Sequence, residues 1–219
     1  MNASQLVASE AKPNRRGGIF VPLSVRAVDG GGIEPILCQT PRLRAPFGIS
    51  CYDESADAPR YSLPLSLEGP DGETFADFLQ TIDTFVLDTA ARNSAKWFKG
   101  KQHSRELLEE LYHPLFVAPP VGSQYAPLFR SGKLKSFGKE IKSPCFDKER
   151  TQVDMRQTVT GGSEVSVYFE ITSIWFNPTS FGVTTVFHQV LAWPRPQHDK
   201  FAFQINDESV CSDDCSLTL

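Results

Sequence analysis

The sequence predicts a mainly β protein with one strong helix. Apolar side chains alternate with a period of two in several segments, which is typical of half-buried strands. One segment instead repeats its apolar residues with the 3.6-residue period of a helix. The sixteen prolines exceed the usual number for 219 residues, and many of them lie beside turn residues, as in β-rich chains with long connections.

The first strands are expected in the N-terminal third. Residues 19–25 alternate between apolar and other side chains, and the glycines at 30–32 end this strand in a turn. Residues 33–43 are less regular and are expected to return as a second strand. Residues 61–67 have the clearest period of two in the chain, but Pro64 donates no ladder hydrogen bond, so this strand is expected at an edge or a bulge.

The strong helix is predicted over residues 73–92. Its apolar residues from position 75 to position 86 follow one helix face, and Thr74 with Asp77 resembles a capping box. The opposite face is polar, so the helix is expected to pack on one side and to cover an end of a sheet. A short second helix is expected at 104–112, where a serine begins it and a proline follows its end.

The C-terminal half contains an irregular segment and a hairpin. Residues 114–146 are rich in Pro and Gly and show no sustained period, which in a compact domain commonly marks a ligand-binding segment. Alternation resumes at 165–171 and 183–193, and residues 177–182 join these two strands. About five strands with one inserted helix, a short second helix and long loops suit an OB-like Greek-key barrel.

The domain organisation predicted from composition is simple. Residues 1–16 are polar and are expected to form a flexible arm. No repeat and no composition break divides residues 17–200, which are therefore expected to form one domain. Residues 201–219 contain four acidic residues and no basic one, and form an acidic tail.

Composition also bounds the setting. No apolar run approaches the roughly 20 residues that span a bilayer, and the N-terminus lacks the pattern of a secretory signal. Five cysteines without regular spacing fit a reducing compartment better than a disulfide framework. A soluble, intracellular protein with no membrane partner is expected.

Charge is distributed unevenly along the chain. Residues 92–150 hold 12 Lys and Arg against 6 Asp and Glu, although the whole chain carries a formal charge of −4. These cations are interleaved with aromatic residues, and binding of single-stranded nucleic acid needs cations for phosphates and rings for bases. An ordinary interpretation also exists, with Trp97 in the core and the lysines on a solvated surface. The residues predicted to bind nucleic acid are Lys96, Trp97, Phe98, Lys99, Lys101, Tyr125, Phe129, Arg130, Lys133, Lys135, Phe137, Lys139 and Lys142.

No catalytic residue, cofactor or metal is predicted. The carboxylates of residues 53–57 have no neighbours in sequence that would desolvate them, and the four histidines lack catalytic or metal-ligand spacing. Cys211 and Cys215 form a pair that no second pair or nearby histidine completes. No nucleophile motif and no complete phosphate loop is present. The sequence favours a binding protein over an enzyme.

The order of several segments resembles a known family. They are 61–67, the helix face at 75–86, Ser94 to Trp97, Tyr125 to Phe129, Lys133 to Lys142, and Ile174-Trp175-Phe176 leading through Gly182 to Val190. In this order they are similar to the bacteriophage T7-type single-stranded DNA-binding proteins, with relatives in large nucleocytoplasmic DNA viruses. The resemblance covers about residues 47–193.

The resemblance implies an OB fold and sequence-tolerant binding of single-stranded DNA in viral DNA replication, recombination or repair, at the site of replication in an infected host cell. In that family an acidic C-terminal tail contacts replication proteins and ends in an aromatic residue, whereas this chain ends in Leu219. The expected partners are single-stranded DNA and replication proteins, and a homodimer is left open. The rival hypothesis is a viral structural or assembly protein that does not bind nucleic acid.

Overall fold

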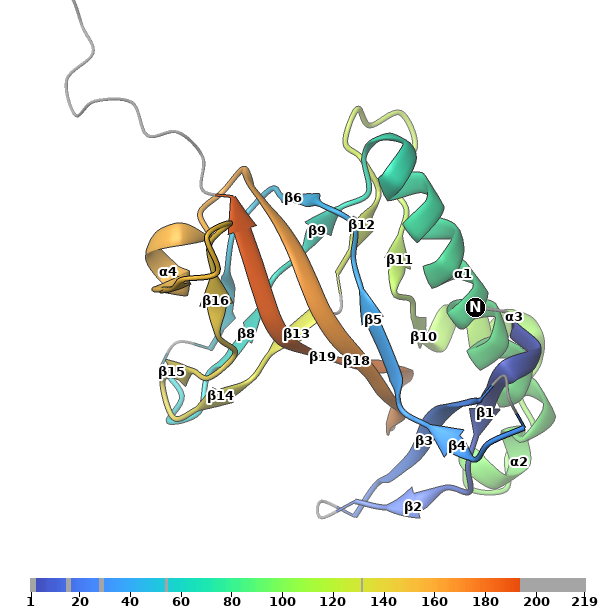
Figure 1. Ribbon diagram of the computed structural model, residues 1–219. Helices are drawn as coiled ribbons and strands as arrows, with labels where there is room; N and C mark the ends of the chain where they lie inside the picture. Colours follow the sequence, from blue (N-terminus) through green and yellow to red (C-terminus); the bar gives the residue numbers. More distant parts are fainter. Residues whose placement is uncertain (1–2, 15–16, 28–29, 54, 131, 194–219) are drawn as a thin grey trace, which may run out of the picture.

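The computed structural model describes residues 3–14, 17–27, 30–53, 55–130 and 132–193 of a mainly β protein (Figure 1). Its two longest strands, β18 (Ser163–Asn177) and β19 (Ser180–Trp193), pair antiparallel over almost their whole length. Two register shifts interrupt their ladder, one of them between Tyr168 and Phe169. The predicted β class and C-terminal hairpin are confirmed, and both strands are longer than expected.

The N-terminal strands lie along the other edge of β18. Strands β3, β5 and β6 each pair antiparallel with it, and β3 in turn pairs with β1, β2 and β4. The expected arm is therefore attached to the sheet at β1 and β2, and the expected strand at 33–43 is divided into three pieces. The elements before the long helix are η1 (Ala3–Gln5), β1 (Leu6–Ala8), β2 (Lys12–Pro13), β3 (Ile19–Arg26), β4 (Ile33–Glu34), β5 (Ile36–Gln39), β6 (Leu43–Ala45), β7 (Ser50–Tyr52), β8 (Arg60–Ser62) and β9 (Leu65–Ser66).

The segment with no sustained period supplies the strands beside β19. Strands β10, β13 and β16 pair parallel with β19, and β13 also meets β8. Each strand is only two or three residues long, which is too short to produce a visible period. The elements after the long helix are α2 (Ser94–Trp97), α3 (Arg105–Leu111), β10 (Tyr112–His113), β11 (Phe116–Val117), β12 (Leu128–Phe129), β13 (Gly132–Leu134), β14 (Ser136–Phe137), β15 (Glu140–Ile141), β16 (Cys145–Phe146), β17 (Gln152–Val153) and α4 (Met155–Thr158).

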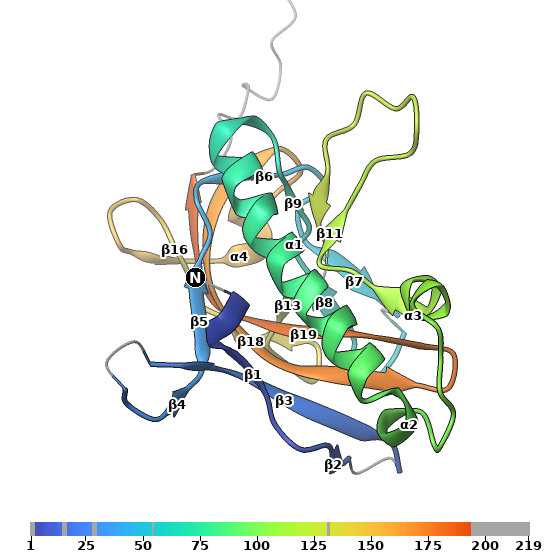
Figure 2. The same ribbon diagram turned by 90° about the vertical axis from the view of Figure 1, so that its right-hand side faces the viewer.

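The long helix α1 (Gly69–Arg92) lies across the strands, as Figure 2 shows. Its apolar face carries Phe75, whose ring centroid lies 5.7 Å from that of Phe129 and 6.1 Å from that of Phe169. The helix begins earlier than predicted, after Glu68, with a proline in its first turn. The Thr74 hydroxyl donates to a carbonyl inside the helix, so the predicted capping box is wrong.

A buried carboxylate attaches α1 to the chain that follows it. Asp83 accepts hydrogen bonds from the Tyr112 hydroxyl (2.7 Å) and from the backbone N–H groups of Leu115 (2.9 Å) and Phe116 (3.1 Å). Burial raises the pKa of Asp83, although the three hydrogen bonds oppose this effect. The short helix α3 packs in the same region, and Ser104 caps it as predicted by accepting from the Leu107 N–H.

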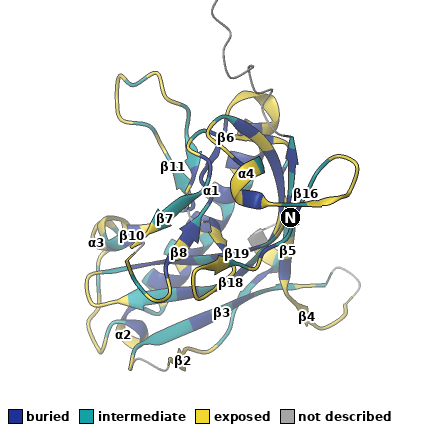
Figure 3. Ribbon diagram, turned by 90° about the vertical axis from the view of Figure 1, so that its left-hand side faces the viewer, coloured by how far each residue is buried: buried dark blue, intermediate teal, exposed yellow. Residues whose placement is uncertain are grey.

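The core lies between α1 and the inward faces of the strands, and exposed residues gather in the loops and on α4 (Figure 3). Four phenylalanines at its centre, Phe129, Phe169, Phe181 and Phe187, are fully buried. None of the helices in the described ranges is long and apolar enough to cross a membrane. The predicted acidic tail, residues 201–219, lies outside the described residues.

Candidate nucleic-acid interface

Cross-strand pairing places several polar and aromatic residues on one face of the sheet. Tyr52 of β7 pairs with Arg60 of β8, and Ser62, two residues further along β8, pairs with Lys133 of β13. Because paired residues and residues two apart in a strand share a face, these four side chains point the same way. The neighbours of Lys133 in β13, Gly132 and Leu134, are buried, so this face is the outward one.

The same face continues onto the long hairpin. Lys133 lies beside Val186 of β19, and Val186 is opposite Glu170 of β18. We call this surface the outer sheet face and define it by its polar and aromatic side chains: Tyr52, Arg60, Ser62, Lys133, Lys135, Tyr168, Glu170 and His188.

Two cations dominate one end of the outer sheet face. Loss of water around the Lys133 side chain, together with the charge of Arg60, lowers the pKa of Lys133. Within the described ranges, no carboxylate lies at salt-bridge distance from either side chain. Two neighbouring positive charges that no described carboxylate pairs with form a place where a phosphate would be stabilised.

A third cation, Lys135, is held by a hydrogen-bonded network. The Lys135 ammonium lies 2.7 Å from Nδ1 of His188, and Nε2 of the same ring lies 3.0 Å from a Glu170 carboxylate oxygen. The ammonium can only donate, so Nδ1 accepts and Nε2 carries the proton that is shared with the carboxylate. This network joins β13, β19 and β18 and fixes the position of the Lys135 charge.

Two exposed rings belong to segments that contact the chain at Arg60 and Pro59. Tyr52, its cross-strand partner, is 75% exposed. Phe137, on the hairpin formed by β14 and β15, is 79% exposed, and the adjacent Ser136 hydroxyl donates to the Pro59 carbonyl over 3.4 Å. An exposed ring next to a cation can stack on a base while the cation holds the neighbouring phosphate.

Three of the predicted stacking rings are not available to a base. Trp97 is 7% exposed and Phe129 is 0% exposed, and both belong to the hydrophobic core. Phe98 is half-buried, with its ring packed against Phe176 and Phe181 at centroid distances of 5.5 Å. The expectation for these rings is corrected, because apolar burial competes with base stacking for the same side chains.

The lysines beside Trp97 do not join the outer sheet face. Lys96, Lys99 and Lys101 belong to α2 and the loop after it, which pack at the turn of the β18–β19 hairpin through Phe181. His188, the partner of Lys135, lies seven residues further along β19, which corresponds to about 23 Å. Figure 1 shows α2 and β14 at separate ends of the molecule.

The remaining predicted residues fall into three places. Tyr125 is 81% exposed on the loop between β11 and β12, and Arg130 is exposed between β12 and β13. Lys142 forms an ion pair with Glu140 at 2.5 Å. Lys139 lies at the turn of the β14–β15 hairpin and borders a cavity. Of the thirteen predicted residues, Lys133 and Lys135 lie on the outer sheet face, and Phe137 and Lys139 lie on the β14–β15 hairpin that follows β13.

Sequence reasoning missed Tyr52, Arg60 and Tyr168. Tyr52 and Arg60 flank an acidic loop, so an aromatic residue precedes the turn and a basic residue follows it. That pattern could have indicated a hairpin with both side chains on one face. Tyr168 alternates within β18 like any strand residue, and nothing in the sequence distinguishes it.

The fold resembles that of solved single-stranded DNA-binding proteins. Similarity to gp2.5, a single-stranded DNA-binding protein encoded by bacteriophage T7, covers 77% of this chain and 91% of that chain, with a TM-score of 0.50 and 11% identity. The single-stranded DNA-binding protein from bacteriophage Enc34 is similar over 88% of this chain and 95% of that one, with a TM-score of 0.43 and 12% identity. The Enc34 protein in complex with single-stranded DNA gives a TM-score of 0.43 and 12% identity over 88% of this chain and 97% of that one.

Comparison of sequences finds no curated protein that matches the chain. A family model does match, and it covers residues 72–205, from the first turn of α1 to beyond β19. The chain therefore belongs to the family of unknown function DUF5871.

Proposed function

We propose that this chain is a non-enzymatic, sequence-tolerant single-stranded DNA-binding protein that binds through the outer sheet face. The observation that carries this proposal is the grouping of Arg60 and Lys133, which have no carboxylate partner among the described residues, with the exposed rings of Tyr52 and Phe137. The fold shared with gp2.5, a single-stranded DNA-binding protein encoded by bacteriophage T7, supports it.

Each kind of side chain has its own task in this proposal. The cations hold phosphates, which every sequence presents alike, so they provide affinity without selecting bases. The rings stack on base faces, which are accessible only when the bases are unpaired. Together these contacts favour a single strand over a duplex and tolerate any sequence.

We further propose that the strands form an OB-like barrel. The pairings of β18 with β19, of β19 with β13, of β13 with β8, of β9 with β6 and of β6 with β18 support this arrangement. Two of these junctions consist of a single residue pair each, Lys133 with Ser62 and Arg44 with Ser66, so the sheet does not close as an uninterrupted ladder.

The biological setting extends the proposal. The resemblance to the T7-type proteins suggests a role in viral DNA replication, recombination or repair, and extends to the relatives in large DNA viruses. In this setting residues 17–200 form the DNA-binding domain, and the acidic tail at 201–219 contacts replication proteins. A homodimer is compatible with this role.

Titration of labelled oligonucleotides tests the function. Fluorescence anisotropy is measured with a single-stranded 20-mer and with the matching duplex, each at 50 mM and 200 mM salt. We expect tighter binding to the single strand, an affinity that falls with salt, and similar affinities for different base compositions. A protein that binds neither substrate would refute the proposal and favour a structural or assembly role.

A further inference from the structure

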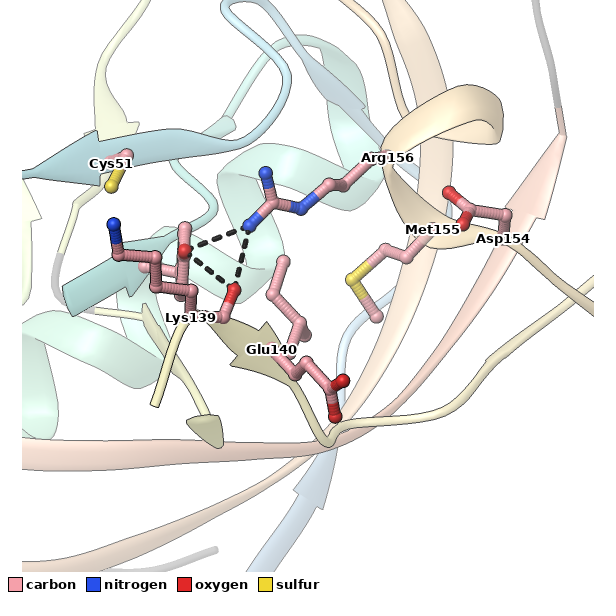
Figure 4. A pocket seen from close by; sticks show the side chains of 8 residues that line it. Cys51, Lys139, Glu140, Asp154, Met155 and Arg156 are labelled. Atoms are coloured by element: carbon pink, nitrogen blue, oxygen red, sulfur yellow. Dashed lines mark hydrogen bonds between the residues drawn. The ribbon is translucent and has the colours of Figure 1, made fainter. Parts of the chain in front are cut away.

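A cavity of about 640 Å³ lies beside the β14–β15 hairpin (Figure 4). Cys51 and Tyr61 line it from β7 and β8, and Lys139 and Ile141 line it from the hairpin. The short helix α4 and the residue before it close the third side with Asp154, Met155 and Arg156. The volume falls within the roughly 300–1,000 Å³ that is usual for small-molecule sites.

The Arg156 guanidinium organises this cavity. Its Nη2 donates to the Tyr61 hydroxyl (2.8 Å) and to the Lys139 carbonyl (3.0 Å). The central carbon of the guanidinium, Cζ, lies 4.9 Å from the centre of the Tyr61 ring. The Tyr61 hydroxyl also donates to the Lys139 carbonyl (2.8 Å). Both Arg156 bonds come from one nitrogen, so the guanidinium keeps further N–H donors for a ligand.

The two acidic residues of the lining are already engaged. Asp154 caps α4 by accepting from the Gln157 N–H over 3.0 Å. Glu140 forms the 2.5 Å ion pair with Lys142. No described carboxylate lies at salt-bridge distance from Lys139 or Arg156. Lys139 and Arg156 are thus free of ion pairs with described carboxylates, and the apolar side chains of Ile141 and Met155 lie in the same lining.

We propose that this cavity holds one nucleotide of a bound single strand, with a phosphate against Lys139 and Arg156 and the base against Ile141 and Met155. A ligand with an anionic group and a planar ring matches the lining, because the anion suits the two cations and the ring suits the two apolar side chains. This inference rests on the proposed function and adds a subsite to it.

The β14–β15 hairpin connects the cavity with the outer sheet face. Phe137 and Lys139 are two residues apart, so their Cα atoms are separated by at most about 7 Å. A strand that stacks one base on Phe137 can therefore place the next nucleotide at Lys139. The alternation of β7 points Cys51 away from Tyr52, so Cys51 belongs to the cavity and Tyr52 to the outer sheet face.

Cys51 provides a reporter for occupancy of the cavity. The rate of its alkylation by N-ethylmaleimide is followed by peptide mass spectrometry in the full chain, with Cys38 of β5 as the internal reference. With a thymidine 20-mer at ten times its Kd, about one cavity in eleven is empty, so we expect the Cys51 rate to fall about tenfold. The Cys38 rate should stay constant.

Variants and smaller ligands sharpen the test. Lys139→Glu should abolish the protection of Cys51, whereas Lys148→Glu, on an exposed loop outside the lining, should retain it. Thymidine and inorganic phosphate should give no protection, because thymidine lacks the phosphate and inorganic phosphate lacks the base. Equal protection by thymidine monophosphate at the oligonucleotide concentration would overturn the assignment to a strand and indicate a free nucleotide as the ligand.

The two proposals fail in different ways. If the oligonucleotide binds by anisotropy but leaves the Cys51 rate unchanged, the cavity inference is wrong and the proposed function stands. If protection persists in Lys139→Glu, the phosphate position is wrong. If no oligonucleotide binds, the proposed function fails and the inference fails with it.

Discussion

Replacing Lys133 by methionine tests the outer sheet face most directly. Methionine keeps much of the aliphatic length of the side chain but removes its charge. Lys133 points outward from β13, lies beside Arg60 and has no carboxylate partner within the described part of the chain. The substitution therefore removes a phosphate contact and breaks no ion pair.

The expected magnitude follows from counter-ion release. Each phosphate contact on a single strand contributes about −0.7 to the slope of log K against log salt, so Arg60, Lys133 and Lys135 together give about −2.1. Between 50 mM and 200 mM salt, these three contacts account for a loss of affinity of about 18-fold. Lys133→Met should make the slope less negative by about 0.7, and the two contacts that remain on this face account for a loss of about 7-fold.

Fluorescence anisotropy at four salt concentrations measures these slopes. Lys101→Met is the matched control, because Lys101 is an exposed lysine that follows α2 and lies away from the outer sheet face. Its slope should equal that of the unmodified protein. An unchanged slope for Lys133→Met, or an equal reduction in the control, would refute the assignment of phosphate contacts to this face.

Three further substitutions test the stacking ring and the scaffold. Phe137→Ala should weaken binding of single strands of any sequence by about 1–3 kcal/mol, whereas Tyr125→Ala should leave the affinity unchanged. Gly132→Ala should lower the free energy of unfolding by about 1–3 kcal/mol, because the added Cβ would lie 2.0 Å from the buried ring of Phe187. Asp83→Asn should remove a pH dependence: burial raises the pKa of Asp83, so its contribution to the unfolding free energy is fully present below about pH 4 and falls as the pH rises through the folded-state pKa.

Each of these expectations has a contrary result. A loss of affinity in Phe137→Ala that is confined to one base would indicate base recognition instead of stacking. Gly32→Ala is the control for Gly132→Ala, because no described atom other than those of its two chain neighbours lies within 4 Å of the Cβ it would add. An equal effect of both substitutions in chemical denaturation would contradict the steric argument. For Asp83, the contrary result is an unfolding free energy of the unmodified protein that rises with pH relative to that of the variant.

The sequence by itself determined the elements whose periods are long and regular. The strands of the C-terminal hairpin and the helix α1 have this property, because each has one buried face and repeats it over several turns or residue pairs. The excess of basic and aromatic residues in the middle of the chain was also evident, and it includes four residues of the region proposed to bind DNA.

Only the tertiary structure decided which of these residues form one surface. The sequence shows that Lys133 belongs to a group of cations, but not that β13 lies beside β8, whose paired residue Ser62 is 71 positions earlier in the chain. A ring next to a lysine is equally suited to the core and to a base, and the contact of Trp97 with Phe176 fixed its place in the core. Local pattern records the period of burial, whereas pairing and packing between distant segments are determined by the fold as a whole.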